Sequence, residues 1–109
     1  MPRKTMESLT ESMFYVLMAL RIKPMCVIDI AAYIEMRTAR RLLIGPATLY
    51  TVLGKFEKEG YIREIQVEGR KRTYAITDIG EQAYRTELSR LRCCVRDAED
   101  AEREKGEHL

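Results

Sequence analysis

Two short segments of the chain carry side chains suited to binding phosphate groups. The first is a run of basic residues next to Gly69, namely Arg70, Lys71 and Arg72. Guanidinium and ammonium groups are common protein donors to phosphate oxygens. The second is a set of hydroxyl and amine side chains earlier in the chain: Thr48, Tyr50, Thr51 and Lys55. The basic run is either a phosphate-binding site or an ordinary solvated turn, and Tyr50 is either a contact residue or a surface tyrosine whose hydroxyl lies in water.

The sequence contains no motif that is typical of catalysis or metal binding. No Gly-rich phosphate loop, nucleophile elbow or paired histidine and carboxylate occurs. His108 stands alone in a charged terminal run, and the 3 cysteines include the adjacent pair Cys93 and Cys94. This count fits neither a disulfide framework nor a C-x-x-C metal knuckle. We therefore predict that the protein is not an enzyme and holds no cofactor or metal.

Length and composition indicate one domain. The chain has 109 residues, of which 46% are hydrophobic and 33% charged, enough apolar material for a core. The longest apolar stretch, Met13–Leu20, is far shorter than the roughly 20 residues of a membrane-spanning helix. The basic N-terminus continues into Glu7 and Glu11 instead of a secretory segment. We expect a cytoplasmic protein with no membrane partner.

Apolar residues at helical spacing predict three helices that position these polar groups. The first runs from an N-cap at Thr10 to about Arg21, and the second covers residues 26–37. The third begins at Pro46 and ends at Gly60, with an apolar face opposite the polar set named above.

Short β-forming segments accompany these helices. Residues 41–44 predict a brief strand or extended connector ending at Gly45-Pro46. Residues 61–67 and 72–76 are rich in β-formers and flank a Gly-centred turn, which predicts a hairpin with a basic tip.

The last predicted helix begins after a cap at Thr77. Its apolar residues alternate spacings of four and three, the pattern of a coiled-coil seam that joins two chains: Tyr84, Leu88, Leu91 and Val95. The alternative is that this stripe packs on the first helix of its own chain. Residues 96–109 are nearly all polar or charged, and we predict a fraying, solvated tail. On this helix Cys93 and Cys94 are either packing residues or an intersubunit thiol switch.

The order helix, helix, strand, helix, strand, strand predicts a mainly α, α+β fold, the winged helix-turn-helix. We place this domain at residues 1–76 and the C-terminal dimerisation helix with its charged tail at 77–109. The first part holds 13 basic and 8 acidic side chains and the second holds 6 and 9. The net positive charge therefore lies in the winged-helix part.

Across roughly residues 8–92 the chain resembles the PadR family of bacterial transcriptional regulators, in its short form with one C-terminal dimerisation helix. Four segments in this order carry the resemblance: 9–20, 45–50, 56–62, and 72–77 followed by Gly80. One departure occurs where family members usually have a His-Gly-Tyr-like stretch, since Cys26-Val27-Ile28 stands there instead.

The resemblance implies a sequence-specific regulator of double-stranded DNA, acting as a homodimeric repressor at an inverted repeat. The third helix would enter the major groove, where its polar set would reach base edges or phosphates: Thr48, Tyr50, Thr51 and Lys55. The basic hairpin would contact the backbone phosphates or enter an adjacent minor groove. A small aromatic or drug-like effector would occupy the region between the domain and the dimer helix, where the apolar candidates are Met6, Met13, Phe14 and Tyr84. The alternative function is a winged-helix interaction module or scaffold with weak or no DNA binding.

Overall fold

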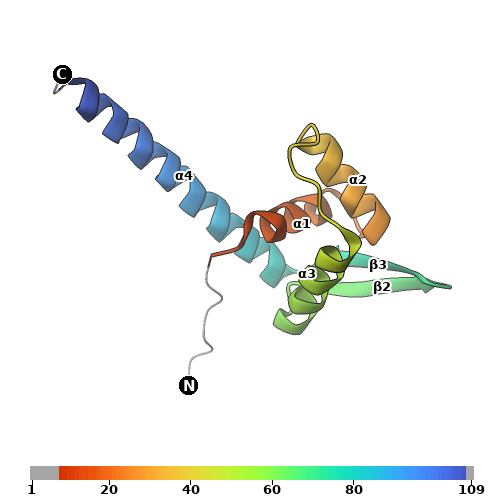
Figure 1. Ribbon diagram of the computed structural model, residues 1–109. Helices are drawn as coiled ribbons and strands as arrows, with labels where there is room; N and C mark the ends of the chain where they lie inside the picture. The colour runs from red at the N-terminus through yellow and green to blue at the C-terminus, as the bar shows by residue number, and fades with distance from the viewer. Residues whose placement is uncertain (1–7, 108–109) are drawn as a thin grey trace.

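The computed structural model describes residues 8–107, which form four helices and one small sheet (Figure 1). The helices are α1 (Glu11–Ile22), α2 (Val27–Arg37), α3 (Pro46–Glu59) and α4 (Asp78–Glu107), and the strands are β1 (Met25–Cys26), β2 (Ile62–Glu68) and β3 (Lys71–Ile76). Helices α1 to α3 gather beside the sheet, and α4 projects away from them, opposite the β2–β3 hairpin. This is the winged helix with an added C-terminal helix, as predicted.

Local signals in the sequence set most of the helix ends. The hydroxyl of Thr10 accepts a hydrogen bond from the backbone N–H of Met13 at 3.1 Å, so the predicted N-cap is confirmed. Pro46 occupies the first turn of α3, where a missing N–H costs nothing. Gly60 ends α3 with φ +78°, the left-handed conformation that glycine adopts without strain.

The sheet is antiparallel with strand order β1-β3-β2. Strand β1 pairs Met25 with Tyr74 and Cys26 with Thr73, so it joins the start of α2 to the hairpin. Of the two alternatives predicted for residues 41–44, the connector is correct and the strand is wrong, because this segment forms no strand and the third strand lies before α2. Leu42 and Ile44 instead pack their side chains against the core.

One hydrophobic core holds the helices and the sheet together. Helix α1 runs through its middle, with Val16, Leu17 and Ala19 fully buried. Helix α3 contributes its predicted apolar face: Leu49, Val52, Leu53 and Phe56. The opposite face of α3 is therefore left to solvent.

Helix α4 is fixed to this core by its first turns. Thr77 caps it, because its hydroxyl accepts from the N–H of Gly80 at 3.1 Å. The Tyr84 ring stacks on Phe14 with centroids 4.9 Å apart, and the Arg21 guanidinium lies 4.6 Å from the Tyr84 centroid. Arg21 also pairs with Glu81 at 2.5 Å, which holds the pKa of that carboxyl below its usual value. The intramolecular alternative for this stripe is therefore correct at Tyr84.

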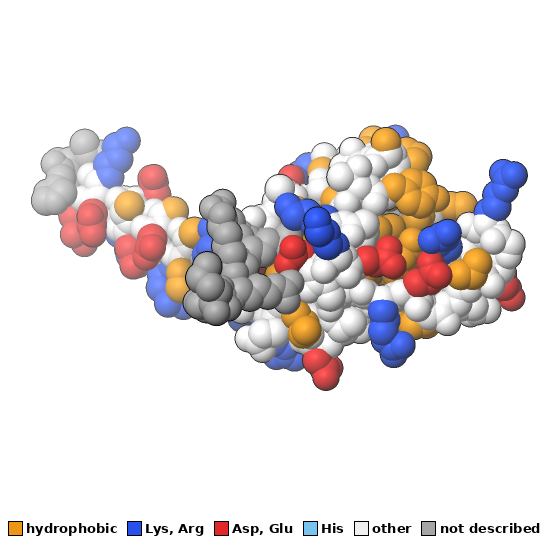
Figure 2. Space-filling view, turned by 90° about the horizontal axis from the view of Figure 1, so that it is seen from below, with side chains coloured by type: hydrophobic (Ala, Val, Ile, Leu, Met, Phe, Trp, Pro, Cys, Tyr) orange, Lys and Arg blue, Asp and Glu red, His pale blue; other side chains and the backbone are white. Residues whose placement is uncertain are grey.

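The predicted fraying tail is wrong over residues 96–107, which continue α4. Most residues in this run are good helix formers, and the side chains of Asp100 and Arg103 form an ion pair one turn apart. Both signs of charge are interspersed along this part of α4 (Figure 2). A polar helix can thus persist here without packing against the core.

Candidate nucleic-acid interface

The exposed face of α3 presents the predicted set of polar side chains. Thr48, Tyr50, Thr51 and Lys55 are all solvent-exposed, and Tyr50 keeps 57% of its surface accessible. The Thr51 hydroxyl donates to the carbonyl of Ala47 at 3.0 Å, which leaves its oxygen free to accept. Because buried apolar residues fix the other face of α3, this face is held rigidly toward solvent.

The hairpin carries the three basic side chains at its tip, on the side of the molecule away from the end of α4. Gly69 makes the turn possible with φ +61°. Arg70, Lys71 and Arg72 are exposed, and Arg72 pairs across the strands with Glu64 at 3.2 Å. Beneath them Tyr74 is buried, and this burial raises the pKa of its hydroxyl.

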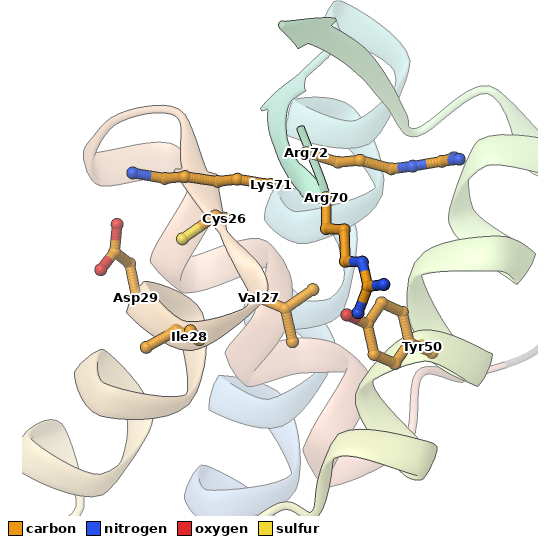
Figure 3. A pocket seen from close by; sticks show the side chains of 8 residues that line it. All are labelled: Cys26, Val27, Ile28, Asp29, Tyr50, Arg70, Lys71 and Arg72. Atoms are coloured by element: carbon orange, nitrogen blue, oxygen red, sulfur yellow. The ribbon is translucent and has the colours of Figure 1, made fainter. Parts of the chain in front are cut away.

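Helix α3, the hairpin and the start of α2 meet around a cavity of about 540 Å³ (Figure 3). Tyr50 and all three basic residues of the hairpin tip line it, so the structure brings these two predicted groups together. Four further lining residues come from β1 and α2: Cys26, Val27, Ile28 and Asp29. Thr48, Thr51 and Lys55 lie on the same helix but outside this lining.

Sequence reasoning missed the contribution of β1 and α2 to this surface. The one available signal was the departure from the family pattern at residues 26–28. Nothing in that segment indicates that it lies beside Tyr50, because the proximity arises from the pairing of β1 with β3. Within the described chain, no group of His, Cys, Asp and Glu side chains is arranged to hold a metal.

The candidate effector residues lie inside the protein. Met13, Phe14 and Tyr84 are each less than 9% exposed, and the two stacked rings fill the space between α1 and α4. A ligand at this place would have to separate Phe14 from Tyr84. Met6 lies outside the described residues, as does His108. The effector site therefore stays a prediction.

The predicted seam on α4 divides into two parts. Tyr84 belongs to the core of its own protomer, and Leu88 and Leu91 are half-buried against it. Val95 is 58% exposed one turn further along, in an outer segment of α4, residues 92–99, that is exposed throughout. Cys93 and Cys94 are both exposed free thiols on this outer segment.

The fold and this surface define a winged-helix protein of the nucleic-acid-binding class, because an exposed polar helix and a basic hairpin tip meet on one side. No helix among residues 8–107 is long and apolar enough to cross a membrane. The model of the transcriptional regulator PadR-like family matches residues 16–86, well over half of the sequence. The chain belongs to this family, whose members are transcription regulators and not enzymes.

Solved structures share the fold. A transcriptional regulator from Clostridium thermocellum has a TM-score of 0.74 at 24% identity, with 82% of this chain and 87% of that chain covered. A PadR family transcription regulator from Clostridium difficile gives 0.72 at 14% identity over 84% and 97%. Bacillus subtilis PadR in complex with operator DNA gives 0.62 at 25% identity over 70% and 46%. A search of curated proteins finds no match.

Proposed function

We propose that the protein is a homodimeric repressor that binds an inverted-repeat DNA operator through α3 and the hairpin. The observation that carries this proposal is the shared cavity: its lining includes Tyr50 of α3 and the three basic residues of the hairpin tip, and the Arg70 side chain points toward Tyr50 (Figure 3). With α3 in the major groove, Thr48, Thr51 and Lys55 reach base edges or nearby phosphates. The hairpin tip then lies over the adjacent backbone or minor groove.

The dimer part of the proposal rests on α4. Its outer segment carries the exposed apolar Val95 beside the half-buried Leu88 and Leu91, and a second copy of the helix would cover them. Two recognition helices about 34 Å apart would then read two half-sites of an inverted repeat. A bound repressor blocks transcription, and a small effector at the junction of α1 and α4 would release it by changing this separation. Such a protein works in the cytoplasm with the chromosome.

Removing two cations from the hairpin tip tests the DNA interface. R70A/K71A should weaken binding to every duplex and reduce the slope of log affinity against log salt by about 2, since each lost phosphate contact contributes about 1. R96A/K105A is the matched control, because it removes the same charge from the far part of α4. Equal slopes for both variants in fluorescence anisotropy would contradict the assignment of the hairpin to DNA.

A scaffold or interaction module is the second candidate function. The observation that favours it is the long polar surface of α4, which carries both signs of charge. In that case R70A/K71A would leave every binding property unchanged, and the partner would be a protein. The salt series above therefore separates the two functions.

A further inference from the structure

The cavity in Figure 3 contains a thiol that the proposed DNA contacts do not use. Cys26 is 6% exposed and free, and its side chain makes no capping hydrogen bond at the start of α2. Its neighbour Met25 packs in the contiguous core, whereas Cys26 does not belong to that core. Successive residues of a strand face opposite sides, so Cys26 turns toward the cavity that it lines. Within residues 8–107 its thiol is free of disulfide and hydrogen-bond partners, and it forms part of the wall of this cavity.

The walls of this cavity favour an anionic occupant. The lining contains three cationic side chains and one carboxylate, that of Asp29; the cations are Arg70, Lys71 and Arg72. Arg72 is paired with Glu64, but within residues 8–107 no ion pair engages Arg70 or Lys71. Tyr50 and the apolar Val27 and Ile28 supply the remaining surface. A cavity of about 540 Å³ admits a molecule of small-peptide size.

From this arrangement we infer that Cys26 is a modification site for low-molecular-weight disulfides that carry carboxylates. The Cys26 Sγ attacks one sulfur of the reagent, a new Sγ–S bond forms and the S–S bond of the reagent breaks. The departing half leaves as a thiol and takes up the proton released from Cys26. The cysteine sulfur is oxidised and the reagent is reduced, so no other oxidant is required. The cationic walls draw the carboxylates of the reagent toward the thiol.

The modification acts on the proposed function, on which this part of the inference rests. The adduct places carboxylates beside Arg70, Lys71 and Tyr50, the groups assigned to DNA. These carboxylates occupy the space and neutralise the cations that a backbone phosphate would need. The protein that carries this mixed disulfide at Cys26 therefore releases DNA, and a reducing thiol restores binding by the reverse exchange.

The site itself is tested by mass spectrometry, without DNA. C93S/C94S keeps Cys26 as the one remaining thiol, and C26S keeps the exposed pair. C93S/C94S should gain one glutathionyl group from oxidised glutathione, and it should react more slowly with the neutral 2-hydroxyethyl disulfide. Adding R70A/K71A should slow the glutathione reaction about tenfold and leave the neutral reaction unchanged. An unmodified Cys26, or equal rates for the two reagents, would overturn the inference.

Fluorescence anisotropy with the promoter fragment upstream of the gene for this protein tests whether modification of Cys26 releases DNA. Glutathionylated C93S/C94S should lose binding and recover it with dithiothreitol, while C26S exposed to the same reagent should keep its affinity. Full binding by the modified protein would overturn the regulatory role and leave the modification site standing. If the untreated protein bound no DNA at all, the proposed function would fail, and the mass result would still decide the chemistry at Cys26.

Discussion

At the scale of single residues, Glu87 on α4 is the one buried charged residue among residues 8–107, with 6% of its side chain exposed. Arg90 donates to its carboxylate at 3.1 and 2.5 Å, and the backbone of Leu9 adds a further hydrogen bond. These contacts lower the pKa of Glu87 from its usual 4.5. A carboxyl with a lowered pKa stabilises the fold above its usual pKa, and the contribution is lost as pH falls through the lowered value.

We therefore expect E87Q to reduce the free energy of unfolding by about 1 to 2 kcal/mol at pH 7. The difference from wild type should shrink as the pH falls below 4.5, where the unfolded chain takes up the proton first, and it should vanish below the lowered pKa, where Glu87 is protonated in the folded protein as well. Urea unfolding at a series of pH values measures both effects. E99Q, at an exposed position on the same helix, is the matched control and should change stability little. A constant difference at every pH would contradict this account of the carboxylate.

At the scale of elements, the close packing of the start of α4 against the base of the hairpin depends on Gly80. A Cβ at this position would lie 2.1 Å from the carbonyl oxygen of Tyr61 and 2.9 Å from Cγ1 of Ile76. G80A should therefore cost about 2 to 4 kcal/mol of stability, since backbone would have to move. G106A is the control, because nothing lies within 4 Å of its Cβ. Thermal unfolding should rank G80A far below G106A, and similar midpoints for the two variants would refute this packing.

Elements with local signals were predictable from the sequence, and elements that depend on distant pairing were not. Thr10, Pro46 and Gly60 mark helix ends through contacts within one turn, so their roles follow from residue type. Strand β1 is two residues long and exists because Met25 and Cys26 pair with β3. The apolar residues at 41–44 left a strand and a connector open, but a strand also needs a partner, and the two edge strands of this sheet are β1 and β2.

The candidate site follows the same division. The polar face of α3 could be identified from the helical periodicity of its apolar residues, and the basic hairpin tip from the run of cations beside Gly69. The participation of Cys26 and Asp29 could not, since tertiary packing alone brings them to the same cavity as Tyr50. Likewise the spacing of α4 predicted an apolar stripe but not that its first member, Tyr84, stacks on Phe14 within the protomer.

At the scale of the whole molecule, the proposal requires two copies joined through α4. V95R places a charge on the exposed part of the seam, so it should dissociate the dimer and leave the protomer folded, because Val95 is 58% exposed. DNA affinity should fall as well, because a monomer bound at one half-site lacks the contacts that the second protomer makes. S89R, at an exposed position off the seam, adds the same charge. Sedimentation of V95R as a dimer would contradict the assigned interface.

The most direct test of the central claim is the binding of the purified protein to its own upstream promoter fragment. Fluorescence anisotropy at two salt concentrations, with an unrelated duplex of the same length, measures affinity, preference and salt dependence together. We predict tight, salt-sensitive binding that prefers the promoter fragment, because the proposed interface assigns base contacts to α3 and backbone contacts to the hairpin. Equal and feeble binding to both duplexes at both salt concentrations would contradict the assignment of this surface to sequence-specific DNA recognition.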